Sequence, residues 1–138
     1  MLILRNVYDE LLRACPKLPP ETGGLIGGRN DIITAFMLDR PGAHGRYAPD
    51  VNILNKTIAE WQERDISFYG LWHSHCTGGD ELSTPDIIYI KKIMQAMPGN
   101  ITRLYFPLVF PGDKLLPFVA TRSSDGVHIE KDALSFIL

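Results

Sequence analysis

The chain has 138 residues, of which 45% are hydrophobic and 22% are charged, and its formal net charge is −2. We expect residues 1–138 to form one domain, since domains commonly hold about 100–200 residues, and a chain of this size can bury a core without disulfides. The apolar content excludes intrinsic disorder. The balance of 14 basic and 16 acidic residues lacks the positive excess that is typical of a nucleic-acid-binding protein.

The N-terminal segment and the cysteines bear on the cellular compartment. The apolar run from Met1 to Leu4 is too short for the hydrophobic region of a signal peptide. No segment approaches the roughly 20 apolar residues that span a bilayer. Cys15 and Cys76 are too few for the disulfide framework of a small secreted domain. We therefore expect a cytoplasmic protein with free thiols and with neither a membrane nor a nucleic acid as partner.

The first part of the chain predicts one helix followed by two strands. A helix is expected from Asn6, whose side chain suits an N-cap, to the proline-rich segment that begins at Pro16. Its apolar residues fall on one face, namely Val7, Leu11, Leu12 and Cys15. Leu25-Ile26 and residues 32–38 are predicted strands, joined through a polar segment with glycines.

The middle of the chain predicts two helices around a buried strand. Residues 40–50 have the composition of a loop, and a helix is expected over about residues 52–64. Residues 66–72 are apolar on both faces of a strand, which indicates a central position in a sheet. The next helix is expected to begin near Ser83-Thr84-Pro85, because Pro suits the first helical position.

The C-terminal part of the chain predicts a further set of strands. Two are expected over residues 104–110 and 115–121, and Pro107 and Pro117 within them indicate edge positions or bulges. A last hairpin is predicted to turn at Ser124-Asp125-Gly126. The remaining tail has no assignable pattern, and the chain as a whole is mixed α/β.

One stretch in the middle of the chain carries a pattern typical of a metal site. Trp72-His73-Ser74-His75 is followed, after seven residues, by Ser83-Thr84-Pro85-Asp86. Strand side chains alternate between faces, so His73 and His75 are predicted to point the same way. Asp86 falls on the buried stripe of the following helix, with Ile90, Ile93 and Met97. A carboxylate there is costly unless it is paired or bound to a metal, and two nitrogens with one oxygen suit an open, catalytic Zn²⁺ site.

Each part of this pattern also has a structural interpretation. Two histidines at a strand end are often buried polar residues whose hydrogen bonds are satisfied within the fold. Ser83 and Asp86 have the spacing of a capping box, in which each side chain serves the start of a helix. The joint pattern favours the metal site, because each element has to fall at its own spacing.

A fourth element lies upstream of the histidines. Glu21 stands in the segment Pro19-Pro20-Glu21-Thr22-Gly23-Gly24, which leads into a glycine-rich strand. Most glutamates are simply solvated. A zinc hydrolase, however, needs a base close to the metal, and glutamate commonly has that role.

Glu21, His73-Ser74-His75, Ser83 and Asp86 together resemble the JAMM (MPN+) zinc metalloprotease motif. The resemblance includes the upstream helix, the glycine-rich strand and the helix–strand unit before the histidines, and it covers about residues 1–121. The chain is similar to the compact prokaryotic JAB-like branch of this family. The fold that this implies is a single-domain α/β/α sandwich with a mixed central β-sheet flanked by helices, similar to that of cytidine deaminases.

The resemblance also implies a role for each motif residue. His73, His75 and Asp86 would be the ligands of one Zn²⁺ ion per chain, Glu21 the general base on the zinc-bound water, and Ser83 a group that helps to bind the developing oxyanion. Family members hydrolyse amide bonds after the C-terminal glycines of ubiquitin or ubiquitin-like proteins. The implied function is a metallopeptidase or isopeptidase that acts on the C-terminal tail of a ubiquitin-like or sulfur-carrier protein. An activating enzyme of the same pathway is a further expected partner.

Two other functions are compatible with such a fold. A non-catalytic MPN-type scaffold binds proteins without chemistry, but such modules usually lack the ligands or the glutamate, and this chain has every motif position. A zinc deaminase would require H-x-E and a later P-C-x-x-C, which this chain does not contain.

The chain departs from the family pattern directly after the second histidine. Many members have Pro there, whereas this chain has Cys76. Its thiol is a redox-sensitive group, an alternative ligand or a plain loop side chain, and the last is favoured because three ligands already suffice. The insertions of the eukaryotic deubiquitinating branch are missing, which favours a small sulfur carrier over polyubiquitin as substrate.

Overall fold

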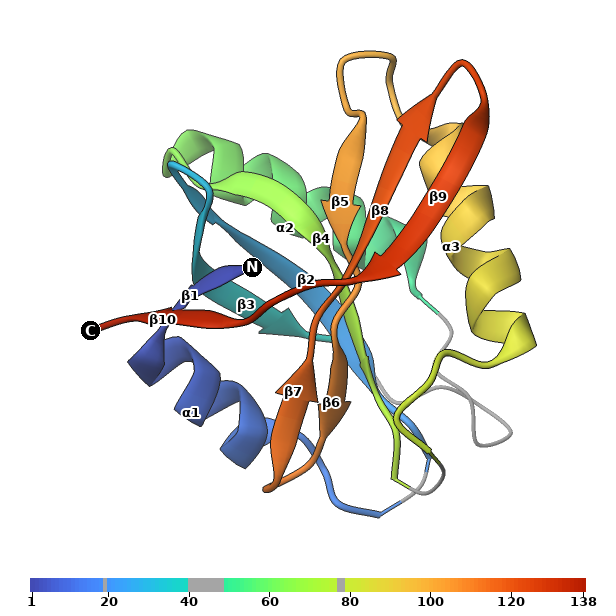
Figure 1. Cartoon of the computed structure of the whole chain (residues 1–138). Helices are drawn as coiled ribbons and strands as arrows, with labels where there is room; N and C mark the ends of the chain where they lie inside the picture. The colour runs from blue at the N-terminus through green and yellow to red at the C-terminus, as the bar shows by residue number, and fades with distance from the viewer. Residues whose placement is uncertain (19, 40–48, 77–78) are drawn as a thin grey trace.

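The computed structural model describes residues 1–18, 20–39, 49–76 and 79–138, which form one mixed β-sheet with helices (Figure 1). The helices are α1 (Arg5–Ala14), α2 (Val51–Glu63) and α3 (Thr84–Ala96). The strands of the described residues are β1 (Leu2–Leu4), β2 (Gly23–Arg29), β3 (Ile32–Leu38), β4 (Ser67–Ser74), β5 (Arg103–Tyr105), β6 (Leu108–Phe110), β7 (Lys114–Leu116), β8 (Phe118–Ser123), β9 (Gly126–Lys131) and β10 (Ser135–Ile137). Their order is β10-β1-β3-β2-β4-β5-β8-β9, and the β6–β7 hairpin pairs with β4 through β6.

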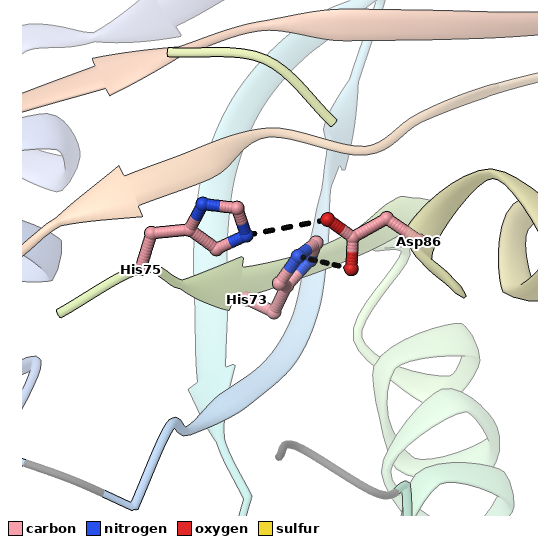
Figure 2. Close-up of side chains that lie close together, drawn as sticks. All are labelled: His73, His75 and Asp86. Atoms are coloured by element: carbon pink, nitrogen blue, oxygen red, sulfur yellow. Dashed lines mark ion pairs between the residues drawn. The ribbon is translucent and has the colours of Figure 1, made fainter. Parts of the chain in front are cut away.

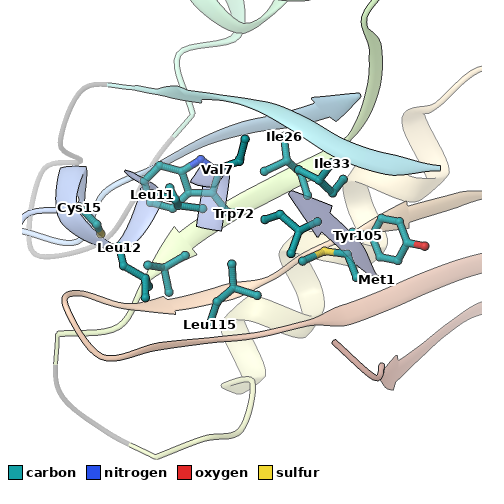
Figure 3. Close-up of a cluster of buried hydrophobic side chains, with 12 residues drawn as sticks. Met1, Val7, Leu11, Leu12, Cys15, Ile26, Ile33, Trp72, Tyr105 and Leu115 are labelled. Atoms are coloured by element: carbon teal, nitrogen blue, oxygen red, sulfur yellow. The ribbon is translucent and has the colours of Figure 1, made fainter. Parts of the chain in front are cut away.

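Helices cover both faces of the sheet, because successive strand residues point to opposite sides. Leu25 and Leu71, which are paired in register, pack in the cluster that includes α2 and α3. Their neighbours Ile26 and Trp72 pack in the cluster that includes α1 (Figure 3). This arrangement confirms the predicted α/β/α sandwich with a mixed central sheet. It also confirms the central position of the strand predicted at 66–72, since β4 lies between β2 and β5.

The start of α1 differs from the prediction, because a strand runs directly into it. The helix begins at Arg5, and Leu4 holds the cap position without a side-chain hydrogen bond. Asn6 is therefore wrong as the N-cap, and its Oδ1 accepts a hydrogen bond from the Val7 N–H at 3.0 Å inside the first turn. The preceding strand, β1, is held by parallel pairing with β3 and with β10 at the opposite end of the chain.

The β2–β3 hairpin turns at Asn30 and Asp31, whose φ angles are 52° and 62°. The glycines predicted to connect the two strands belong to β2, which is longer than predicted. Gly24 is required by close approach, since a Cβ there would stand 1.7 Å from a carbonyl oxygen of β3. The strand predicted at 32–38 is confirmed.

Pro107 and Pro117 interrupt strands that were predicted to be continuous. Residues 104–110 lie in β5 and β6, residues 115–121 lie in β7 and β8, and a buried proline separates each pair. Of the two predicted alternatives, an edge or a bulge, the edge does not apply to β5, because β5 lies between β4 and β8. A proline has no N–H to donate to a neighbouring strand. Between the two prolines, β6 and β7 pair with each other, and β6 pairs with the end of β4. The hairpin predicted at 124–126 is confirmed by the β8–β9 pairing.

The two remaining helices agree with the sequence pattern. Helix α2 begins within one residue of its predicted start, and the Asp50 side chain caps it by accepting a hydrogen bond from the Ile53 N–H at 3.2 Å. Helix α3 begins at Thr84, within the segment Ser83-Thr84-Pro85 where its start was predicted. Most of the predicted loop at 40–50 lies outside the described residues. Within the described ranges, no helix is long and apolar enough to cross a membrane.

Candidate metal centre

The end of β4 carries both histidines on one face of the sheet. Leu71 faces the helices α2 and α3, and His73 and His75 follow it at two-residue steps, so they point to the same side. Ser74 points to the other side, where it is buried and its Oγ accepts a hydrogen bond from the Thr22 N–H at 2.9 Å. The backbone beyond β4 stays paired, because the His75 N–H donates to the Val109 carbonyl at 2.9 Å. The predicted alternation of these side chains is confirmed.

The start of α3 places Asp86 opposite the histidines. Ser83 is the N-cap, and its Oγ accepts a hydrogen bond from the Asp86 N–H at 3.2 Å. The Asp86 Oδ2 accepts one in return from the Ser83 N–H at 2.9 Å. These reciprocal bonds satisfy two N–H groups that the first turn of a helix leaves free. The capping box is therefore present, and it holds the carboxylate in position rather than competing with the site.

The same carboxylate contacts both imidazoles (Figure 2). Asp86 Oδ1 lies 3.2 Å from His73 Nε2, and Asp86 Oδ2 lies 3.3 Å from His75 Nε2. The candidate ligand atoms of the three residues all lie within 4.8 Å of one another. All three side chains are largely shielded from solvent, with exposures of 9%, 12% and 18% in sequence order. The structure thus brings together three residues from the end of β4 and the start of α3 that can hold one metal ion.

The electrostatics of the group favour an ionised carboxylate. Burial raises the pKa of Asp86, but the interactions with His73, with His75 and with the Ser83 N–H outweigh burial and hold that pKa well below its usual range. The hydrogen bond that His75 donates to the Asp86 carboxylate raises the pKa of His75, against the opposing effect of burial. Asp86 is therefore in the form that a metal ion requires.

One buried nitrogen in this group lacks a hydrogen bond. His73 Nε2 forms no hydrogen bond of acceptable geometry with any described residue, although Asp86 Oδ1 is its near neighbour. Buried polar atoms without a partner are rare, and an imidazole nitrogen is a good ligand for a divalent transition metal. The donor set and this nitrogen both fit a bound metal ion.

Glu21 lies beside His75, in the segment directly before β2. Gly23 is paired with His73, and the Ser74 N–H donates to the Thr22 carbonyl at 2.7 Å, so the register continues toward Glu21 and His75. Glu21 Oε2 lies 4.0 Å from His75 Nε2, and the Glu21 side chain is 28% exposed. The glutamate predicted from the motif is thus brought to the histidines.

The two cysteines lie outside this group of potential ligands. Both are free thiols, as predicted. Among the described residues, the group that could hold a metal ion consists of His73, His75 and Asp86, and Cys76 does not belong to it. Cys15 is buried on the α1 side of the sheet, where burial raises the pKa of its thiol. Cys76 is partly exposed in the segment after His75.

Two residues beside the site carried no signal in the sequence. The Phe110 ring, at the end of β6, packs edge-on against His75 with 6.0 Å between ring centroids. The Tyr89 hydroxyl, one turn after Asp86 on α3, is buried without a hydrogen-bond partner among the described residues. Burial, reinforced by the negative charges of Asp39 and Asp86, raises the pKa of Tyr89. Both residues looked like ordinary core positions in the linear pattern.

Comparisons with known proteins support the fold. No family model matches the chain, and no curated protein matches it. Protein DSY2949 from Desulfitobacterium hafniense matches it in structure with a TM-score of 0.65 and 21% identity, over 99% of this chain and 94% of that one. A protein from Salinibacter ruber matches with a TM-score of 0.61 and 16% identity, over 99% and 92% of the two chains.

A third solved structure links the fold to a named domain type. It is AF2198, a JAB1/MPN domain protein from Archaeoglobus fulgidus, with a TM-score of 0.56 and 16% identity over 100% of both chains. At this identity the likeness concerns the fold. The chain has an MPN-like fold, and at the end of its β4 lies a His-His-Asp group that could bind a metal ion.

Proposed function

We propose that this chain is a zinc-dependent metallopeptidase or isopeptidase. Its substrate would be the amide bond that follows the C-terminal glycines of a ubiquitin-like or sulfur-carrier protein. The observation that carries the proposal is the convergence of His73, His75 and Asp86 with Glu21 beside them. These are the residues that the JAMM motif requires, and they lie in an MPN-like fold.

His73, His75 and Asp86 would hold the zinc ion through two nitrogens and one oxygen. Three protein ligands leave a coordination position for water or substrate, which is typical of catalytic zinc. When bound, zinc lowers the pKa of a coordinated water to about 7 and polarises a carbonyl group. The capping box serves this site directly, because it fixes the carboxylate before any metal is bound.

Glu21 would act as the general base and then deliver the proton to the leaving amine. Its carboxylate is adjacent to His75 and partly exposed, so it can exchange a proton with a reactant that lies beside the ligands. A candidate base has to lie close to the proton it takes before its pKa matters. The distance of 4.0 Å between Glu21 Oε2 and His75 Nε2, a candidate ligand atom, supports this role.

Ser83 would help to bind the oxyanion that develops on the substrate carbonyl. Its Oγ already accepts a hydrogen bond from the Asp86 N–H. A hydroxyl has one donor as well as two lone pairs, so capping leaves the O–H free to donate. One such hydrogen bond to the transition state is commonly worth about 3 kcal/mol.

A large cavity on the same side of the sheet as the ligands supports a polypeptide substrate. About 880 Å³ of space lies between α2 and α3, and Leu25 and Leu71 line it. Leu71 is on the same face of β4 as His73 and His75, so the cavity and the metal ligands share one side of the sheet. An apolar surface beside the catalytic group offers a folded substrate a place to bind.

The test is a comparison of the wild type with Glu21→Ala on a protein fusion that carries a Gly-Gly junction. We expect the purified wild type to contain close to one zinc per chain and to cleave the junction. Glu21→Ala is expected to keep the zinc and the fold, measured by elemental analysis and circular dichroism, but to lose cleavage. Undiminished cleavage by the variant would remove Glu21 from the mechanism. A native wild type that takes up no zinc would refute the enzyme and favour the non-catalytic scaffold.

A further inference from the structure

Strand β9 forms one edge of the sheet, and its backbone pattern is defined by neighbouring hydrogen bonds. The Asp132 N–H donates to the Pro117 carbonyl at 3.0 Å, and the Arg122 N–H donates away from β9 to Thr102 at 2.7 Å. Since hydrogen-bonding direction alternates along a strand, the N–H and C=O groups of Val127, Ile129 and Lys131 point outward. No hydrogen bond with a described residue satisfies these outward groups.

A groove lies between β9, the first turns of α3 and residues 81–82. Its volume is about 390 Å³, within the range of about 300–1,000 Å³ that is usual for ligand sites. The lining combines apolar and charged side chains. The apolar residues are Leu82, Ile87, Phe118, Val127 and Ile129, and the charged ones are Glu81, Lys91, Glu130 and Lys131, with His128 beside them. Lys131 and Glu81 are joined by an ion pair.

Two residues that line the groove are sequence neighbours of the capping box at the start of α3. Leu82 directly precedes Ser83, and Ile87 directly follows Asp86, and both line the groove. A chain that lies along β9 is therefore close to the start of α3, where the capping box holds the carboxylate. The groove therefore connects β9 with the segment that carries Asp86.

We propose that the outer edge of β9 binds an extended segment of the substrate polypeptide as an additional strand, with an apolar side chain of that segment in the groove. The identity of this peptide rests on the proposed peptidase function, whereas the binding itself does not. Unpaired N–H and C=O groups at every second residue are complementary to another extended backbone. The apolar side chains that line the groove select apolar residues at the alternate positions that face it.

A second copy of this chain fits the same edge less well. Antiparallel pairing of β9 with its own copy would place both α3 helices on the same face of the joined sheet. Because α3 lies alongside β9 (Figure 1), the two helices would meet across the groove. A single extended peptide avoids that encounter.

The test measures amide hydrogen exchange in the full chain with a blocked peptide of alternating Thr and Val. At saturating peptide we expect exchange at Val127, Ile129 and Lys131 to slow by about tenfold or more, because each outward N–H gains a partner. The amides of His128 and Glu130 point toward β8, so they are the internal reference. The same peptide, N-methylated at the residues that would donate to β9, is expected to cause no slowing.

A substitution on the protein gives an independent arm. Ile129→Pro removes an outward N–H but no hydrogen bond to β8, so the ladder is expected to persist. We expect this variant to lose the peptide-dependent slowing at Val127 and Lys131, and its KM for the fusion to rise about tenfold without loss of zinc. Ile129→Val, the matched control, is expected to behave as the wild type. If the proline variant does not fold, the N-methylated peptide on the wild type still decides the matter.

The outcomes separate this proposal from the peptidase function. Cleavage of the fusion by the wild type without any peptide-dependent slowing would overturn the β9 site. If amide exchange in β9 slowed without peptide as the protein concentration increased, and light scattering showed a dimer, the site would be assigned to a second copy and the proposal would be overturned. If the peptide slowed amide exchange in β9 but did not inhibit cleavage of the fusion, the substrate would not be the occupant of this edge. Slowing without any cleavage by the zinc-loaded wild type would overturn the peptidase function.

Discussion

The two ends of α3 are both held by side chains that bind backbone groups, but the side chains come from different places. At the N-terminus, Ser83 and Asp86 bind each other's N–H groups across a single turn. At the C-terminus, Arg122 of β8 reaches across from the sheet. Its guanidinium donates to the carbonyls of Met94, Met97, Pro98 and Ile101, at distances of 2.7 to 2.9 Å.

This difference separates two tasks along one helix. The N-terminal cap shares its carboxylate with His73 and His75, so a change there alters the metal centre. The C-terminal clamp contains none of the candidate ligands. It satisfies carbonyls that a helix end leaves without partners, so a change there should alter stability alone. Substitutions at the two ends test whether these tasks are in fact separate.

The largest effect is expected for Asp86→Ala. Removing the carboxylate leaves two of the three candidate ligands, so zinc content should fall from close to one per chain to near zero, and cleavage should disappear with it. Loss of half the capping box is expected to cost only about 1 kcal/mol of folding free energy. Elemental analysis gives the zinc content, and urea unfolding of the metal-free proteins gives the stability.

Two variants serve as controls for that experiment. Asp125→Ala removes an exposed carboxylate in the β8–β9 turn, and it should leave the zinc content unchanged. Asp86→Asn keeps an oxygen that can accept from the Ser83 N–H, so it should retain the cap while it weakens zinc binding. Full zinc occupancy in Asp86→Ala would contradict the ligand assignment.

The next effect concerns the opposite end of the helix. Arg122→Met keeps an unbranched apolar side chain but removes all the guanidinium hydrogen bonds to the four carbonyls. Since a hydrogen bond to a charged group contributes about 1.5–3 kcal/mol and part of this clamp is exposed, we expect a loss of about 2–4 kcal/mol in the free energy of unfolding. Chemical denaturation measures this loss.

The zinc content of the same variant decides whether the ends are independent. We expect Arg122→Met to bind zinc as the wild type does at temperatures where it remains folded. The free energy of unfolding of Arg122→Lys should lie between those of the wild type and Arg122→Met, because an ammonium group cannot reproduce the planar fork of the guanidinium. Loss of zinc from a folded Arg122→Met protein would mean that the clamp also positions the metal centre.

The N-terminal end of α3 was predictable because its information is local. Pro85 fixes the first turn, Ser83 and Asp86 have capping-box spacing, and the two-residue step from His73 to His75 determines their common face. The structure adds that capping and metal binding use the same carboxylate. The sequence pattern presented these as alternatives. Spacing alone does not reveal that Asp86 Oδ2 can accept from the Ser83 N–H while both Asp86 oxygens lie near a histidine.

The parts that could not be predicted depend on contacts between distant residues. Nothing near Arg122 marks it as the clamp of a helix on another element. The short strands β1 and β10 exist because they pair with each other across the length of the chain. Pro107 and Pro117 were expected at an edge or a bulge, but the sequence did not show that the strands would divide there into separate strands with different partners. Local preference gives each element, whereas such pairings depend on the assembled sheet.

The smallest expected effect on stability separates the two roles of Ser83. Ser83→Ala should lower the free energy of unfolding by about 1 kcal/mol, whereas Ser83→Gly should lower it by only a few tenths, because glycine is tolerated at an N-cap. Both variants lose the hydroxyl, so both should lose about 100-fold in kcat if Ser83 donates to the oxyanion. Ser83→Thr should retain stability and most of the rate.

The comparison of alanine with glycine is the informative step, since it varies the cap while the hydroxyl is absent from both variants. Urea unfolding and single-turnover cleavage of the Gly-Gly fusion, each at full zinc occupancy, measure the two quantities separately. If kcat followed stability through the series, Ser83 would act only by holding the start of α3. If kcat depended on the hydroxyl alone, the N-cap would also be the oxyanion donor, and one residue would link the local geometry of the helix to catalysis.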